Sequence, residues 1–293
     1  MQDDGTLAPP PDDFVPPKPD ASHVALRTAS AVGLAIIAFA AAWGGVLPFA
    51  AFVLAVALFM SWEWCGVVRG GGIDAALVVQ GLAVAAATAL AAWGFAALGL
   101  AVLIIGTIIV LALEFGGRPI LSAAGVLYAG LPAVALVWLR SDEPTGFEAV
   151  LFIVLVVVAT DTLAFATGRL AGGPRLAPAI SPNKTWSGFL GGITAAGLAA
   201  AGFAYALNGP VGLLAATGVA MGIIAQLGDL AESAMKRSFH IKDVSQLLPG
   251  HGGFMDRMDG LVPVAVAAAL VGLFLDPHAP AGALLAGLSR GGP

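Results

Sequence analysis

Nine apolar runs, each about as long as a lipid bilayer is thick, occupy most of this 293-residue chain. A bilayer core of about 30 Å requires roughly 20 helical residues. The runs cover residues 25–44, 46–66, 75–95, 98–114, 119–139, 147–168, 188–207, 210–235 and 260–276. Only 11% of the residues are charged, against about 25% in soluble proteins. The sequence therefore predicts an all-α, polytopic integral membrane protein with about nine transmembrane helices.

The basic residues are distributed unevenly between the two sides that nine crossings create. With the N-terminus placed inside, eleven of the 13 Lys and Arg residues fall inside, and Arg140 and Arg290 fall outside. Basic loops tend to stay in the cytoplasm. The sequence therefore predicts a multi-pass protein of the cell (inner or plasma) membrane, with its N-terminus and polar loops in the cytoplasm and its C-terminus outside.

Shorter polar segments flank the apolar region. Residues 1–22 are rich in proline and aspartate, which predicts a disordered cytoplasmic tail rather than a signal peptide. We expect residues 23–277 to form a single transmembrane domain and residues 278–293 a short C-terminal tail. The one cysteine, Cys65, cannot form an internal disulfide.

The first dense polar segment lies between residues 161 and 188. Its candidate phosphate-binding residues are Lys184, Arg169 and Arg175, with Ser181, Asn183 and Thr185 as further hydrogen-bonding groups around Lys184. Lys184 is the strongest candidate, because its neighbours supply further hydrogen-bonding groups. The alternative is an ordinary positively charged cytoplasmic loop with Trp186 at the membrane interface. The Trp62-Glu63-Trp64 run is likewise interpreted most simply as part of an interfacial aromatic belt.

The second polar segment runs from Ser233 to Asp259. Its basic residues are Lys236, Arg237, Lys242 and Arg257, and its acidic residues are Asp243, Asp256 and Asp259. Between them, the turn of Gly250, His251, Gly252 and Gly253 lets a ligand approach the backbone closely. His251 could bind phosphate, transfer a proton or cap the turn. Basic groups, carboxylates and a glycine loop together favour polyphosphate binding at the end of a membrane helix.

Carboxylates inside the apolar helices form another group of candidates. Asp229, Glu232 and Lys236 fall on one helix face at spacings of three and four residues. A carboxylate within an apolar run, such as Asp229 or Asp161, by default faces the bundle interior or a watery cavity. The structural alternative for Asp229 is an ion pair with Lys236 or Arg237.

Asp256 and Asp259 are three residues apart, so they share a face if the ninth helix has already begun there. Paired aspartates beside basic residues could hold Mg²⁺ bound to phosphates. The alternative is the ordinary preference for acidic residues at a helix N-terminus.

Specific motifs then connect the two polar segments to a known family. The longer pattern is Ser233-x-Met235-Lys236-Arg237, Lys242-Asp243, and His251-Gly252-Gly253-Phe254-x-Asp256-Arg257-Met258-Asp259. The shorter pattern is Gly168-Arg169, Leu176-Ala177-Pro178, Ser181-Pro182 and Lys184-Thr185-Trp186, with Trp62-Glu63-Trp64 as a further feature. These patterns resemble those of the phosphatidate cytidylyltransferase (CDP-diacylglycerol synthase) family. The chain departs from them at Leu170, Gly173, Ala179 and Ser187.

The resemblance implies a Mg²⁺-dependent enzyme that condenses CTP with phosphatidic acid to give CDP-diacylglycerol and pyrophosphate in phospholipid biosynthesis. The expected catalytic residues are Asp256, Asp259, Lys236, Arg237, Lys242 and His251. The expected substrate-binding residues are Lys184, Ser181, Thr185, Arg169, Arg175, Gly252, Gly253, Arg257 and Asp243. The expected metal ligands are Asp229, Asp256, Asp259 and Asp161. Residues 23–277 would be the catalytic domain, with the active site on the cytoplasmic side.

The implied partners are CTP, phosphatidic acid and the lipid bilayer, with no nucleic acid. A second cation and a homodimer are compatible with the resemblance. A transporter or channel with Asp161 and Asp229 along an ion path is the alternative from another class, although no inverted repeat is found. Another lipid-phosphate enzyme, such as a polyprenol kinase or an alcohol phosphatidyltransferase, is the third hypothesis.

Overall fold

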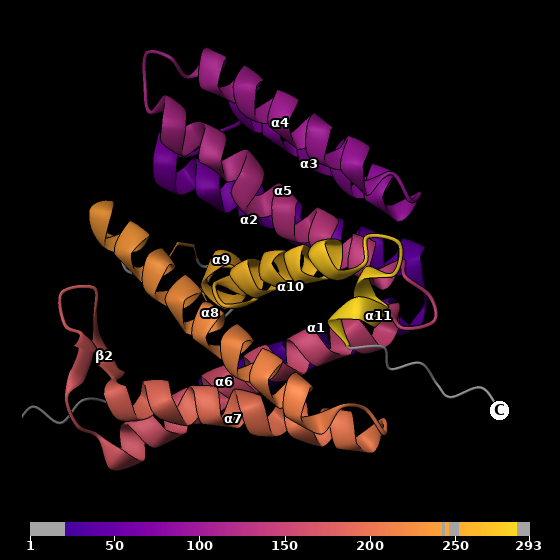
Figure 1. The fold of residues 1–293 in the computed structure, drawn as a ribbon. Helices are drawn as coiled ribbons and strands as arrows, with labels where there is room; N and C mark the ends of the chain where they lie inside the picture. Colours follow the sequence, from indigo (N-terminus) through magenta and orange to yellow (C-terminus); the bar gives the residue numbers. More distant parts are fainter. Residues whose placement is uncertain (1–20, 242–243, 246–251, 286–293) are drawn as a thin grey trace, which may run out of the picture.

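The computed structural model describes residues 21–241, 244–245 and 252–285, and most of this length is helical (Figure 1). The long helices are α1 (Ala21–Trp43), α2 (Val46–Arg69), α3 (Ala75–Ala92), α4 (Ala96–Leu113), α5 (Pro119–Arg140), α6 (Gly146–Ala171), α7 (Trp186–Ala206), α8 (Val211–Ser238) and α10 (Leu261–Leu275). The short elements are β1 (Arg175–Ala177), β2 (Ser181–Thr185), α9 (Met255–Met258) and α11 (Pro280–Leu284). The all-α prediction is confirmed, with one small hairpin added.

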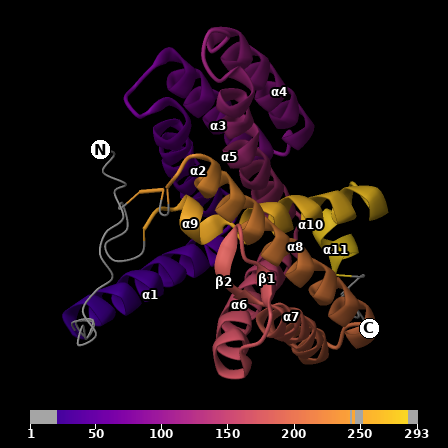
Figure 2. The same ribbon diagram turned by 90° about the vertical axis from the view of Figure 1, so that its left-hand side faces the viewer.

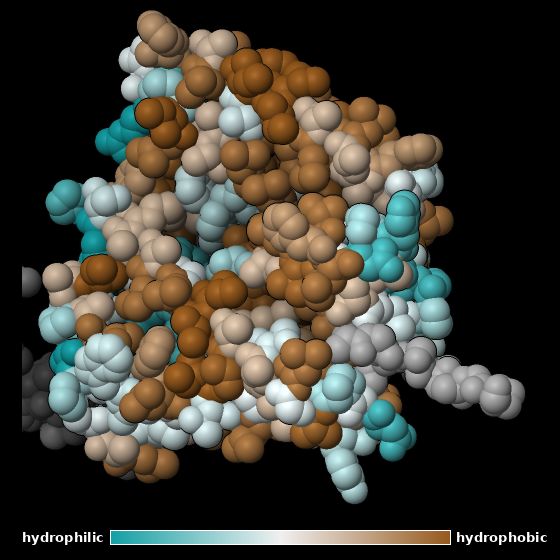
Figure 3. Space-filling view, viewed as in Figure 1, coloured by the Kyte–Doolittle hydropathy of each residue, from teal (hydrophilic) through white to brown (hydrophobic). Residues whose placement is uncertain are grey.

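Each predicted apolar run falls on a helix, but the helices differ in length. Among the described residues, the seven helices α2 to α8 are long and apolar enough to cross a bilayer. α10 has 15 residues, and the apolar part described for α1 spans Val32–Trp43. Apolar residues dominate the face drawn in Figure 3, and polar residues gather towards its left and right edges. The protein is therefore a multi-pass membrane protein, and nine crossings stay a prediction.

α5 is the central helix of the bundle, and 67% of its apolar span is buried, the largest share among the seven. It packs against α2, α3 and α4, and also against α10. α6, α7 and α8 form a second group, and α10 lies between α5 and α8 (Figure 1). α1 projects away from the bundle in Figure 2 and packs mainly against α2.

Glycines let the helices of the second group approach closely. A Cβ atom on Gly188 of α7 would lie 2.8 Å from the carbonyl oxygen of Ala164 in α6. A Cβ atom on Gly218 of α8 would lie 2.7 Å from the carbonyl oxygen of Ala196 in α7. Both distances are too short for a side chain, so glycine is required at these crossings. Small residues at helix contacts are typical of membrane bundles, and here they fix the hairpin beside α8.

Two polar side chains at the junction of α5 and α6 bind the backbone of α1 and α11. Arg140, a basic residue that the charge count assigns to the outside, is 4% exposed and donates from Nε to the carbonyl oxygen of Ala42 at 2.7 Å. Asp142 accepts hydrogen bonds from the backbone N–H groups of Ala281 and Gly282 in α11, at 2.7 and 3.0 Å. The segment predicted as a C-terminal tail therefore contains a packed helix.

Candidate active site

The C-terminal part of α8 presents its polar residues on one face, as their spacing predicts. Nζ of Lys236 lies 3.1 Å from Oε1 of Glu232 and 2.7 Å from Oδ1 of Asp256. Glu232 is 4% exposed, and the hydroxyl of Tyr128 in α5 donates to its Oε2 at 3.4 Å. Lys236 therefore connects α8 to the polar segment that follows it.

Asp229 pairs with the hairpin rather than with its own helix. Nζ of Lys184 lies 2.6 Å from Oδ2 of Asp229, so the two side chains form an ion pair. Ser233 donates to the other carboxylate oxygen at 3.4 Å. The two side chains are 23% and 34% exposed. This contact joins the two polar segments, and it corrects the alternative in which Asp229 pairs with Lys236.

Asp256 holds together the two ends of the glycine-turn loop. Its Oδ2 accepts hydrogen bonds from the backbone N–H groups of Val244 at 3.1 Å and Gly253 at 3.0 Å. Burial raises the pKa of Asp256, but the hydrogen bond from Lys236 and these backbone groups outweigh it. The pKa of Asp256 therefore lies below its ordinary value, and the carboxylate is ionised.

Glu63 of α2 is a second carboxylate that holds this loop, and the sequence analysis does not include it in the site. It is 2% exposed and accepts hydrogen bonds from the backbone N–H groups of Phe254 at 3.0 Å and Met255 at 2.8 Å. The hydroxyl of Ser245 donates to it as well. A Cβ atom on Gly253 would lie 2.6 Å from Oε1 of Glu63, so a side chain there would displace the carboxylate from its hydrogen bonds.

A sequence signal for Glu63 exists, because an acidic residue within an apolar helix is by default functional. The aromatic residues on either side favour the belt interpretation instead. Trp62 is 46% exposed, whereas Trp64 is 6% exposed and donates from Nε1 to the carbonyl oxygen of Leu121 at 2.8 Å. The belt interpretation is therefore wrong for Glu63 and for Trp64.

Asp259 follows α9 and lies in a group of carboxylates. Burial and the charges of Asp229 and Glu232 raise the pKa of Asp259 to about 8, and the charge of Asp161 acts in the same direction. Its Oδ1 accepts the backbone N–H of Gly260 at 2.7 Å. A carboxyl group in such surroundings favours either a proton or a bound cation.

Asp256 lies in α9, and Asp259 and Gly260 keep right-handed helical backbone angles between α9 and α10. Their carboxylates nevertheless have different partners. Asp256 contacts Lys236, whereas Asp259 lies among the acidic residues. In the part of the chain that the structure describes, no three His, Cys, Asp or Glu side chains are arranged to hold a metal ion.

The hairpin of β1 and β2 carries Lys184, and α7 follows β2 directly. Thr185 is the N-cap of α7: its hydroxyl accepts the backbone N–H of Gly188 at 3.1 Å, and the residue is 5% exposed. Nε of Arg237 donates to the carbonyl oxygen of Ile180 at the hairpin turn, at 3.4 Å. Thr185 therefore has a structural role, and its contact with substrate stays a prediction.

The other predicted site residues differ in their exposure. Exposed residues are Arg169, Arg175, Arg257 and Asp161, and partly exposed residues are Ser181 and Gly252. Lys242, Asp243 and His251 lie outside the described residues. The residues that the structure gathers into one charged cluster are Lys184, Asp229, Glu232, Lys236, Asp256 and Asp259. Of these six, Glu232 is missing from the predicted set of site residues.

A bundle of apolar helices with lysines and carboxylates paired at one end is the arrangement of an integral membrane enzyme with a charged substrate. The chain belongs to the cytidylyltransferase family, whose model matches residues 25–275. This confirms the resemblance found in the sequence. The chain is thus a nucleotidyltransferase, which decides against the transporter and channel alternative.

Individual relatives support the same assignment. The chain is 39% identical over 271 residues to the phosphatidate cytidylyltransferase of Brucella suis, which covers 88% of this chain and 97% of that protein. It is 40% identical over 139 residues to the protein of the same name from Staphylococcus haemolyticus, or 47% of this chain and 52% of the relative. A Mycobacterium tuberculosis protein of that name is 44% identical over 130 residues, or 43% of this chain and 39% of the relative.

Proposed function

We propose that this protein condenses CTP with phosphatidate to give CDP-diacylglycerol and pyrophosphate, with Mg²⁺ as its cofactor. The relatives that match most of the chain are phosphatidate cytidylyltransferases. The observation that carries the proposal is the contact between Lys184 and Asp229, because it brings the hairpin to the charged face of α8. Cations from two separate segments then lie near the same carboxylates, as the binding of a polyphosphate requires.

In this reaction, a phosphate oxygen of phosphatidate attacks the α-phosphorus of CTP. A P–O bond forms there as the bond from the α-phosphorus to the bridging oxygen of the β-phosphate breaks. Pyrophosphate leaves with that electron pair. A phosphate monoester is already anionic at neutral pH, so the protein has to align two anions and offset their charge rather than supply a strong base.

The two lysines of the cluster would offset this charge. An ammonium group has three hydrogen donors. Lys236 uses two of them for Glu232 and Asp256, which leaves a third for a phosphate oxygen. Lys184 forms an ion pair with Asp229 and would offer its remaining donors to a phosphate oxygen. Their carboxylate partners fix both ammonium groups before the substrate binds.

Magnesium fits the carboxylates around Asp259. Mg²⁺ is usually held by one or two carboxylates together with substrate phosphates and waters, so it needs no complete cage of protein ligands. Asp259 would be the main ligand, with Asp229 and Asp161 beside it, whereas Asp256 is already engaged with the loop. Bound there, the ion would withdraw charge from the triphosphate and stabilise the leaving pyrophosphate.

We place this cluster on the cytoplasmic side, where the basic residues gather. The test is an assay of purified protein in vesicles that contain phosphatidate, with CTP labelled at the α-phosphate and with MgCl₂. Labelled CDP-diacylglycerol and an equal amount of pyrophosphate should form, and UTP should replace CTP poorly. Failure to form CDP-diacylglycerol under these conditions would overturn the proposal. Release of labelled CDP only when the vesicles also contain a polyprenol would favour a polyprenol kinase instead.

A further inference from the structure

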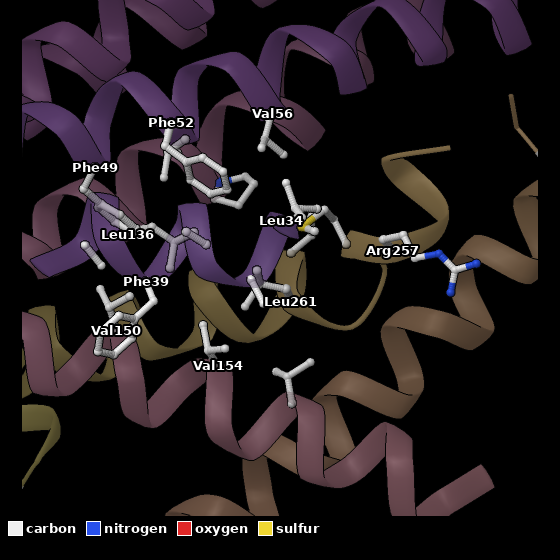
Figure 4. A pocket seen from close by; sticks show the side chains of 18 of the residues that line it. Leu34, Phe39, Phe49, Phe52, Val56, Leu136, Val150, Val154, Arg257 and Leu261 are labelled. Atoms are coloured by element: carbon white, nitrogen blue, oxygen red, sulfur yellow. The ribbon is translucent and has the colours of Figure 1, made fainter. Parts of the chain in front are cut away.

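An apolar groove with a volume of about 820 Å³ lies between α1, α2, α5 and α6 and reaches the start of α10. This volume is typical of ligand-binding pockets. Two of its lining residues are charged, Asp161 and Arg257. Figure 4 shows Phe39, Phe49 and Leu136 together at one end and Arg257 at the other, with its guanidinium group turned away from the apolar side chains.

On the basis of the proposed function, we propose that this groove binds the acyl chains of phosphatidate, with the lipid phosphate beside Arg257. The apolar walls suit hydrocarbon, and a guanidinium group suits a phosphate. A nucleotide or a peptide would bury unpaired polar groups against these walls. Asp161, at the same end, lies within electrostatic range of Asp229 and Asp259. The charged end of the groove therefore adjoins the candidate active site.

The groove is long enough for a fatty acyl chain. Phe147 and Asp161 both line it and lie 14 residues apart on α6, which corresponds to about 21 Å at the rise of an α-helix. The hydrocarbon of one leaflet is about 15 Å deep, half of the bilayer core. A chain that lies along α6 from Asp161 would reach the phenylalanines at the far end.

The groove opens sideways between α1 and α6. Ile36 of α1 is 63% exposed, and Val154 and Val158 of α6 are 40% and 56% exposed, although all three line the groove. α1 packs mainly against α2 and makes little contact with α6. An acyl chain can therefore pass from the surrounding bilayer into the groove without entering water.

The first test fills the groove with a larger side chain. Val154→Trp should raise the KM for dioleoyl phosphatidate by about tenfold or more, while the KM for CTP changes by less than about twofold. Turnover of dihexanoyl phosphatidate should also be retained, because Val154 lies about 10 Å along α6 from Asp161, beyond the end of a six-carbon chain.

Val78→Trp is the matched control, because Val78 of α3 is 48% exposed and does not line the groove. It should behave like the wild type with both lipids. Equal kinetics of the Val154→Trp and Val78→Trp variants would overturn the proposal. An equal loss of activity with the long and the short lipid would overturn it as well.

A binding measurement on the unchanged protein separates this proposal from the proposed reaction. Phosphatidate with a diazirine near the end of an acyl chain, photolysed in vesicles, should label peptides around Phe39, Phe49 and Val150. Even labelling of all lipid-facing helices, α3 and α4 included, would overturn the groove assignment even if CDP-diacylglycerol is formed. Labelling of the groove without CDP-diacylglycerol formation would support the binding site and overturn the proposed reaction alone.

Discussion

The carboxylate of Glu63 accepts the backbone N–H of Met255 at 2.8 Å, and this bond joins α2 to α9 across 192 residues of sequence. Glu63 also holds Phe254 and Ser245, on the two sides of residues 246–251. A hydrogen bond to a charged acceptor contributes about 1.5–3 kcal/mol. The position of the segment that carries Asp256 therefore depends on a side chain of the second helix.

We expect Glu63→Gln to lower kcat by about tenfold or more, roughly 1.4 kcal/mol of barrier. A neutral amide offers one acceptor oxygen where three donors are bound, so the segment around Asp256 loses its fixed position. Kinetics and thermal denaturation of the purified variant would be compared with those of Glu114→Gln, which changes an acid at the end of α4. Wild-type kcat in Glu63→Gln would show that the loop is held by other contacts.

Gly253→Ala should impair the protein in the same way, because its Cβ atom would lie 2.6 Å from Oε1 of Glu63. We expect a loss of kcat of about tenfold with CTP binding less affected. Gly66→Ala is the control, since a Cβ atom there meets nothing within 4 Å. Equal activities of the two alanine variants would contradict the close contact between Gly253 and Glu63.

Lys184→Met and Asp229→Asn should each lower activity by about tenfold or more. Each single variant leaves one charge without its partner, so each should also lower the thermal midpoint of unfolding. The double variant should recover thermal stability but not activity, because both groups are proposed to act on the substrate or its metal. Arg69→Met, which breaks the ion pair between Arg69 and Asp74 outside the proposed site, is the control. Recovered activity in the double variant would reduce the pair to a structural ion pair.

The thermal stability of the metal-free protein should fall as the pH rises from about 5 to about 8. The pKa of Asp259 is about 8 in the folded protein and 3.8 ordinarily, so in this range the folded state keeps a proton that the unfolded state has lost. A rise in pH removes that proton and leaves a charge beside other carboxylates. Mg²⁺ should restore stability more at the upper end of this range than at the lower end.

Asp259→Asn should flatten that pH dependence and weaken the response to Mg²⁺. Asp276→Asn should leave both unchanged, because Asp276 is exposed beyond α10. Thermal unfolding of the three proteins with and without MgCl₂ would measure the difference. The same pH profile in Asp259→Asn and in the wild type would remove Asp259 as its cause.

The predicted orientation can be measured with single cysteines in a Cys65→Ala background. Ala179→Cys lies in the hairpin and Asn208→Cys lies between α7 and α8, and both positions are exposed. An impermeant maleimide should label Ala179→Cys from the cytoplasmic side and Asn208→Cys from the outside. Labelling of both from the same side would contradict a crossing by α7.

The helices and the charged face of α8 are predictable because they depend on local features. A bilayer requires a fixed length of apolar helix, and the spacing of Asp229, Glu232 and Lys236 places them on one face in any α-helix. The approximate location of the site, where two polar segments follow α6 and α8, can be predicted for the same reason.

The partners of these residues depend on tertiary packing and are not predictable from spacing. Lys184 reaches Asp229 because β2 packs beside α8 in the folded chain. Asp256 pairs with Lys236, whereas Asp259 accepts the backbone N–H of Gly260, and a spacing of three residues cannot indicate these partners. Glu63 binds a loop that lies far away in the sequence, so its role appears only in the folded chain.

If phosphatidate binds in the groove as proposed, the sideways opening between α1 and α6 would make the reaction rate depend on the lipid concentration within the membrane. A phosphatidate molecule that enters from the bilayer would reach the groove by diffusion within the plane of the membrane. The relevant quantity is then the mole fraction of phosphatidate in the leaflet, not its amount per volume of solution. Dilution of phosphatidate with an inert phospholipid would slow such a protein, whereas the addition of more vesicles of the same composition would not change the rate per protein molecule.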